Sequence, residues 1–64
     1  MGITEKEYIT KNIEDLISVR RRLGKIALFA ERNGDKKKAD YYKGLINSTN
    51  EYIKFHANRL IRSY

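Results

Sequence analysis

The side chains that could do chemistry in this chain are one histidine, His56, a few scattered acids, and a concentration of arginine and lysine in the middle of the sequence. Cysteine is absent, and no HExxH, CxxC or glycine-rich phosphate-binding motif occurs. A single histidine cannot hold a metal ion, and no nucleophile or acid lies one helical turn from it. We therefore expect no enzyme, no metal site, no cofactor and no small-molecule substrate.

The basic residues are concentrated between positions 20 and 43, where nine cations accompany three acids. The rest of the chain has five basic and five acidic residues, so the whole net charge of +6 falls within this span. Lysines 36–38 would occupy the first turn of a second helix, where each cation opposes the helix dipole at a cost of roughly 0.3–1 kcal/mol. Arginines 20–22 have no acid three or four residues further on. A sequence selected only for stability would place acids at such positions, which favours a binding role.

Cations in this arrangement predict contacts with the phosphates of RNA or DNA. Specificity would come from the shape of the nucleic acid, because few Asn or Gln side chains accompany the cations. Tyr41 lies beside the lysines and could stack on a base. A solubilising surface and a site for an acidic protein partner are the alternatives. The candidate nucleic-acid-binding residues are Arg20, Arg21, Arg22, Lys25, Lys36, Lys37, Lys38, Tyr41 and Lys43.

Two long helices must position these residues. Thr4 and Glu7 form a capping box, which predicts a helix that begins near Glu5. Gly34 can adopt the left-handed conformation that ends a helix, and Asp35 can cap the next one. We therefore expect one domain over residues 1–64, with a helix over about 5–33, a turn at 33–35 and a second helix over about 36–62.

Apolar residues recur at helical spacing in both segments, and a reversal at Gly34 brings them together. The main layers pair Ile9 with Leu60, Leu16 with Ile53, Leu23 with Ile46, and Ala30 with Ala39. The alternate layers pair Val19 with Thr49, Ile26 with Tyr42, and Asn12 with His56, the last as a hydrogen-bonded polar layer that fixes the register. The predicted fold is all-α, an antiparallel two-helix hairpin.

A second copy of the chain is the expected reinforcement of so small a fold. A chain of this length hides only about 60% of its unfolded surface, and it has no disulfide to compensate. Two hairpins packed together would form a dimeric four-helix bundle. Apolar residues that flank the seam between the helices would form the dimer interface: Tyr8, Ile13, Ala27, Phe29, Leu45, Tyr52 and Ala57, together with Tyr64.

The longest apolar run, residues 26–30, is too short for a membrane span or a signal peptide. The absence of cysteine fits a reducing compartment. We therefore expect a cytoplasmic regulatory protein without membrane association, which forms a homodimer and binds nucleic acid. The alternative is a protein–protein adaptor or inhibitor, from a virus, plasmid or similar element, that docks on a larger partner. The residues expected to carry that contact are Ile17, Leu28, Phe55 and Ile61.

Overall fold

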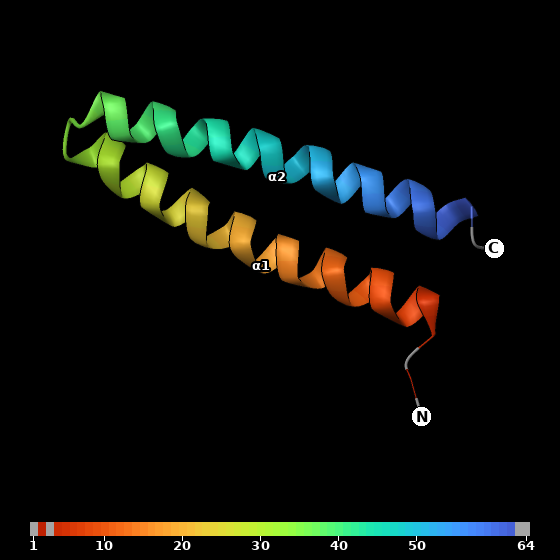
Figure 1. Ribbon diagram of the computed structural model, residues 1–64. Helices are drawn as coiled ribbons and strands as arrows, with labels where there is room; N and C mark the ends of the chain where they lie inside the picture. Colours follow the sequence, from red (N-terminus) through yellow and green to blue (C-terminus); the bar gives the residue numbers. More distant parts are fainter. Residues whose placement is uncertain (1, 3, 63–64) are drawn as a thin grey trace.

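The computed structural model describes residue 2 and residues 4–62, which form two α-helices. Helix α1 spans Glu5–Arg32 and helix α2 spans Lys36–Arg62. The helices run antiparallel, joined by a turn at residues 33–35 (Figure 1). The described residues contain no strand, so the predicted all-helical hairpin is confirmed. Tyr64 lies outside the described residues.

The N-cap hydrogen bond of the capping box predicted for the start of α1 is present. Thr4 is the N-cap, and its Oγ1 accepts a hydrogen bond of 3.1 Å from the backbone N–H of Glu7. Glu5 and Glu7 place negative charge in the first turn, where the helix dipole is positive. These features fix where α1 begins.

The turn closes α1 and opens α2 over three residues. Gly34 has a φ of +75°, a left-handed conformation that strains any residue with a Cβ. The N–H groups of Gly34 and Asp35 donate to the carbonyls of Glu31 (3.0 Å) and Ala30 (2.9 Å), which is the Schellman pattern. Asp35 Oδ1 then accepts a hydrogen bond of 3.1 Å from the N–H of Lys38. Asp35 therefore completes the end of one helix and caps the next.

The predicted main layers lie in the seam between the helices. Ile9, Ala30 and Ala39 are buried, and the other five members are half-buried. The buried residues near the turn, which include Ala27, are all alanines, and small side chains allow helix axes to approach closely. The bulkier Ile9 fills the seam near the open end, where the two ribbons lie further apart (Figure 1).

The alternate layers differ from the prediction on α1. Val19 and Ile26 are 44% and 37% exposed, whereas Arg20 is half-buried and Ala27 is only 5% exposed. Helix α1 is thus rotated so that the row containing Arg20 and Ala27 faces α2. Ala27 suits the close approach, and the aliphatic stem of an arginine can pack in a seam while its charged group reaches a polar partner.

On α2 the expected inner row is present, because Thr49 is buried and Tyr42 and His56 are half-buried. The hydroxyl of Thr49 donates a 2.8 Å hydrogen bond to the carbonyl of Leu45, its own helix's backbone four residues earlier. Nδ1 of His56 is buried without a hydrogen-bond partner. The sequence predicted that Asn12 and His56 form a hydrogen-bonded polar layer. The structure corrects this for Nδ1 of His56, which neither accepts nor donates a hydrogen bond.

Candidate nucleic-acid interface

Three contacts between the helices define two broad faces of the hairpin. Lys43 forms an ion pair with Glu31, and Asn50, seven residues further along α2, accepts a hydrogen bond from Arg20. Residues seven apart lie on the same side of a helix, so both contacts belong to one face, which we call the polar face. Arg59 lies nine residues, or about two and a half helical turns, after Asn50 and therefore on the opposite side of α2, where it approaches Glu5 at 3.8 Å. We call that side the aromatic face.

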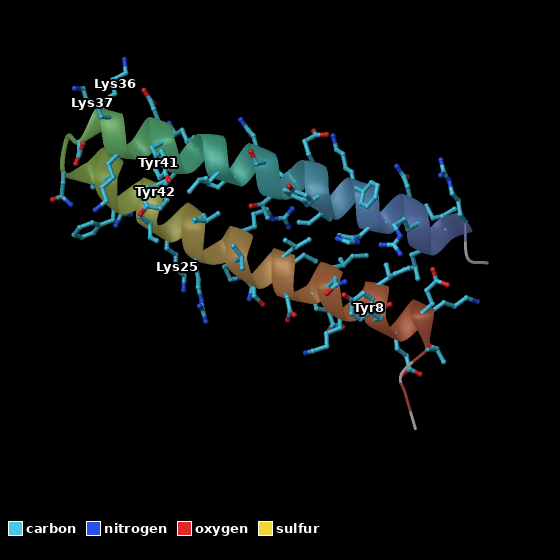
Figure 2. All side chains as sticks on the ribbon, viewed as in Figure 1. Tyr8, Lys25, Lys36, Lys37, Tyr41 and Tyr42 are labelled. Carbon is cyan, nitrogen blue, oxygen red and sulfur yellow. The ribbon has the colours of Figure 1, made fainter. Side chains whose placement is uncertain are left out.

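The predicted phosphate-contacting residues surround the turn-side half of the hairpin. Lys36 and Lys37 project from the outer edge of α2, whereas Lys25 projects from the opposite edge, beyond α1 (Figure 2). Helical spacing places Arg21 on the polar face and Arg22 on the aromatic face. The cations therefore form a collar around the turn-side half of the rod rather than a patch on one surface.

Six of these cations are available to an incoming ligand. Their side chains are exposed, and within residues 4–62 none of the six makes an ion pair or a side-chain hydrogen bond. Free arginine and lysine groups offer N–H donors that suit phosphate oxygens. We define the basic collar as these six residues: Arg21, Arg22, Lys25, Lys36, Lys37 and Lys38.

Arg20 differs from its two neighbours. It is half-buried, and its Nη1 donates a hydrogen bond of 2.8 Å to Oδ1 of Asn50. This bond joins the two helices, so Arg20 has a structural role that the sequence analysis did not predict. One feature of the sequence does indicate this role. Arg20 lies seven residues from both Ile13 and Ala27, which are half-buried and buried, so it shares their side of α1.

Lys43 is also engaged within the hairpin. A hydrogen bond to the Glu31 carboxylate, together with the charge of that group, raises the pKa of Lys43; Asp40 adds to the effect, and partial desolvation opposes it. Because Glu31 already neutralises Lys43, its ammonium is a weaker candidate for phosphate contact than the collar residues. A surface hollow of about 280 Å³ lies beside the Lys43–Glu31 pair. It is lined by Glu31 and Asp40 as well as by Lys36 and Lys43, so it presents charges of both signs.

Tyr41 lies next to the collar with 63% of its surface exposed. Its ring meets the ring of Tyr42 edge-on, with centroids 5.2 Å apart and planes at 84°. Tyr42 is half-buried in the seam and therefore supports one edge of the Tyr41 ring (Figure 2). The ring remains exposed on the aromatic face, one turn after Lys38, where a base could stack on it.

The residues predicted for the dimer interface do not all share a surface. Tyr8, Phe29 and Tyr52 are exposed and Leu45 is half-buried, and all four lie on the aromatic face. The other three are Ile13 and Ala27, which pack in the seam, and Ala57, which is half-buried toward the polar face. Of the residues predicted for an adaptor, Ile17, Leu28 and Ile61 lie toward the polar face and Phe55 lies on the aromatic face.

Residues 4–62 contain neither a candidate metal cluster nor a helix that could span a membrane. No group of three or more His, Cys, Asp or Glu side chains there is arranged to hold a metal ion. Neither described helix has a stretch that is long and apolar enough to cross a membrane. No known protein family, curated protein or solved structure matches this chain. The class of protein defined by its fold and surface is a helical hairpin with a basic collar at the turn.

Proposed function

We propose that this chain is a nucleic-acid-binding regulatory protein that acts as a homodimer and contacts phosphates through its basic collar. The observation that carries the proposal is the state of the collar: six exposed cations on the turn-side half of the hairpin, none of them neutralised within the described chain. The proposed role is binding, because exposed arginine and lysine groups supply fixed positive charge and N–H donors for phosphate oxygens.

The shape of the collar favours a ligand that partly surrounds the end of the hairpin. The structure measures 48 × 21 × 11 Å, and Lys25 and Lys37 project from opposite edges of the 21 Å width (Figure 2). One straight duplex would meet cations on one side only. A looped RNA, or two nucleic-acid segments that lie on either side of the turn, would contact the whole collar. Phosphate contacts of this kind recognise shape more than sequence.

The energetics of α2 support the same role. Lys36, Lys37 and Lys38 form the first turn of α2, which contains no acidic residue. Each cation there opposes the helix dipole, and the three repel one another. Their placement lowers the stability of the hairpin, which is understandable if the three charges serve a ligand.

A charge-reversal experiment tests the proposal. We would measure binding of a labelled RNA hairpin and a labelled DNA duplex by fluorescence anisotropy between about 50 and 200 mM salt, where phosphate contacts weaken steeply. The variant K36E/K37E/K38E should lose binding. The matched control K11E/K54E/R62E has the same net charge but is changed in the other half of the hairpin, and it should retain most of the affinity.

Three outcomes would contradict the proposal. The chain could bind neither nucleic acid even at low salt, or the two triple variants could lose affinity equally, which would mean that only net charge matters. A large drop in the melting temperature of K36E/K37E/K38E would show that the lysines support the fold. We expect instead an unchanged or higher melting temperature, because glutamates in the first turn of a helix favour its dipole.

A protein adaptor is the second candidate, and the exposed aromatic face favours it. Phe55 is 58% exposed there, and large exposed apolar surfaces mark sites of protein association. The two functions are separated by pull-down from native lysate with and without nuclease. Partners that are lost after nuclease treatment support nucleic-acid binding, and partners that persist support the adaptor.

A further inference from the structure

The aromatic face carries most of the large apolar side chains that the hairpin leaves exposed. On α2, Tyr52 and Leu45 lie seven and fourteen residues before Arg59, which places them on its side of the seam. On α1, Val19 and Ile26 lie fourteen and twenty-one residues after Glu5, which places them on the same side of the seam as Glu5. Further apolar residues lie within one helical turn of these. The complete set is Tyr8, Val19, Ile26, Phe29, Leu45, Tyr52 and Phe55, of which all but the half-buried Leu45 are 37–68% exposed. Tyr41 lies on the same side beside lysines 36–38, where it belongs to the candidate nucleic-acid interface.

The polar face has a different composition. Its large exposed apolar residues are Leu28 and Ile61, which lie near opposite ends of the hairpin. Between them it presents Lys43, Asn47 and Asn50 along α2, together with Glu31 on α1. One broad side of the hairpin therefore carries seven of the nine large exposed apolar residues in the described chain, together with Arg22 and the Arg59–Glu5 pair, as expected of a layer that packs against another.

The exposed area is sufficient for a stable dimer. The accessible surface is 5288 Å², whereas a compact monomer of 7.6 kDa would expose about 4,300 Å². The excess of about 1,000 Å² is close to the roughly 800 Å² that each partner buries in a standard interface. A side of the rod measuring 48 × 21 Å provides an area of that size.

We propose that the aromatic face binds a second copy of this chain, reversed end to end, so that lysines 36–38 of the two copies lie at opposite ends of a four-helix assembly. This inference rests on the proposed homodimer and specifies its interface and orientation. It keeps Tyr8, Phe29, Leu45 and Tyr52 from the interface predicted from sequence. Ile13, Ala27 and Ala57 lie outside the aromatic face and are not part of it.

Charge determines the orientation. All of the net charge of +6 falls on the turn-side half of each chain, and the other half is neutral. Two copies with their turns together would bring two such halves side by side. Reversal places lysines 36–38 of the two copies near opposite ends of the 48 Å rod, several times further apart than the roughly 8 Å over which physiological salt screens charge, whereas Arg21 and Arg22 stay near its middle. Lysines 36–38 of each copy would then lie over the neutral half of the other copy.

The apolar side chains also match in this orientation. The Arg20–Asn50 hydrogen bond shows that Val19 and Asn50 lie at nearly the same level, midway along the hairpin. A two-fold axis at that level places α1 over α1 and α2 over α2. Leu45 and Phe55 lie five residues before and after Asn50, so the two-fold axis brings Leu45 of one copy to the level of Phe55 of the other. On α1 the same axis places Val19 of one copy against Val19 of the other.

Tyr8 and Phe29 follow the same rule, because they lie eleven and ten residues from Val19 in opposite directions. A self-complementary surface is what a two-fold interface requires. Aromatic and aliphatic anchors in such pairs supply much of the affinity of protein interfaces.

The first test compares two substitutions on α1 with similar exposure and the same change of charge. Val19→Glu lies on the aromatic face at 44% exposure, and Leu28→Glu lies toward the polar face at 48%. Sedimentation should show the wild type and L28E as dimers at micromolar concentration and V19E as a monomer, with helicity followed by circular dichroism. A monomeric wild type, or a dimer disrupted by L28E and not by V19E, would overturn the inference.

The second test determines the orientation. The chain has no cysteine, so Val19→Cys introduces a single thiol close to the proposed axis. Mild oxidation should convert V19C into a disulfide-linked dimer, whereas S18C, on the outer surface of α1, should remain reduced. If V19C sediments as a dimer but does not cross-link, the reversed orientation is wrong. Both tests are made without nucleic acid, so their failure leaves the result of the phosphate-binding experiment intact.

Discussion

Arg20 on α1 donates a hydrogen bond of 2.8 Å from its Nη1 to Oδ1 of Asn50 on α2, which joins the two helices near the middle of the hairpin. A hydrogen bond from a charged group contributes more than one between neutral groups, at about 1.5–3 kcal/mol. This contact separates Arg20 from Arg21 and Arg22, whose side chains remain exposed.

We expect Arg20→Ala and Asn50→Ala each to lower the free energy of unfolding by about 1–2 kcal/mol. The double variant should cost less than the sum of the two, with a coupling of about 1 kcal/mol. Urea denaturation of the four proteins measures this cycle. Strict additivity would show that the contact contributes nothing. In the anisotropy assay, R20A should weaken nucleic-acid binding less than R22A does, once both proteins are confirmed to be folded.

Gly34 and Gly44 should respond to alanine in opposite directions. The φ of +75° at Gly34 makes a Cβ unfavourable by about 1 kcal/mol, so G34A should lower the melting temperature. Gly44 lies inside α2 with nothing within 4 Å of an added Cβ, so G44A should raise the free energy of unfolding by up to about 1 kcal/mol. Thermal denaturation of both variants tests the turn, and a G34A protein as stable as the wild type would contradict it.

Ile9 is the largest fully buried side chain among the described residues, at 0% exposure. Ile9→Ala should lower the free energy of unfolding by about 2–4 kcal/mol, because it removes buried apolar surface and leaves a cavity. Ile61→Ala is the matched control near the same end. Because Ile61 is 69% exposed, this substitution should lower the free energy of unfolding of the hairpin only slightly. Equal losses in denaturant titrations would show that Ile9 does not pack as described.

The ion pair of Lys43 with Glu31 predicts a dependence on alkaline pH. The pKa of Lys43 is raised above its ordinary value of 10.5 in the folded protein. Folding therefore favours the protonated lysine, so the contribution to stability is fully present at neutral pH and is lost as the pH rises through the raised pKa. The difference in melting temperature between the wild type and Lys43→Met should be small at pH 7 and should shrink further above pH 10.5. A difference that grows with pH would contradict this assignment.

The collar was predictable from sequence because it depends on where charges fall along two helices whose ends are locally encoded. Thr4, Gly34 and Asp35 fix those ends through hydrogen bonds and backbone conformation within a few residues. Which of the cations stay free was not predictable. The engagement of Arg20 by Asn50 and of Lys43 by Glu31 involves residues far apart in the chain.

The sequence by itself determined two helices, one glycine-centred turn and the row of residues from Ile9 to Ala30 that faces α2, because these follow from local capping and from the helical repeat. Only the tertiary structure decided which second row of α1 enters the seam. Helical spacing allows either the row of Val19 and Ile26 or the row of Arg20 and Ala27, and the choice depends on how side-chain sizes on both helices fit together. The small Ala27 permits a close approach near the turn, so α1 is rotated to face α2 with that row. The same rotation leaves Val19 and Ile26 exposed and thereby adds them to the aromatic face.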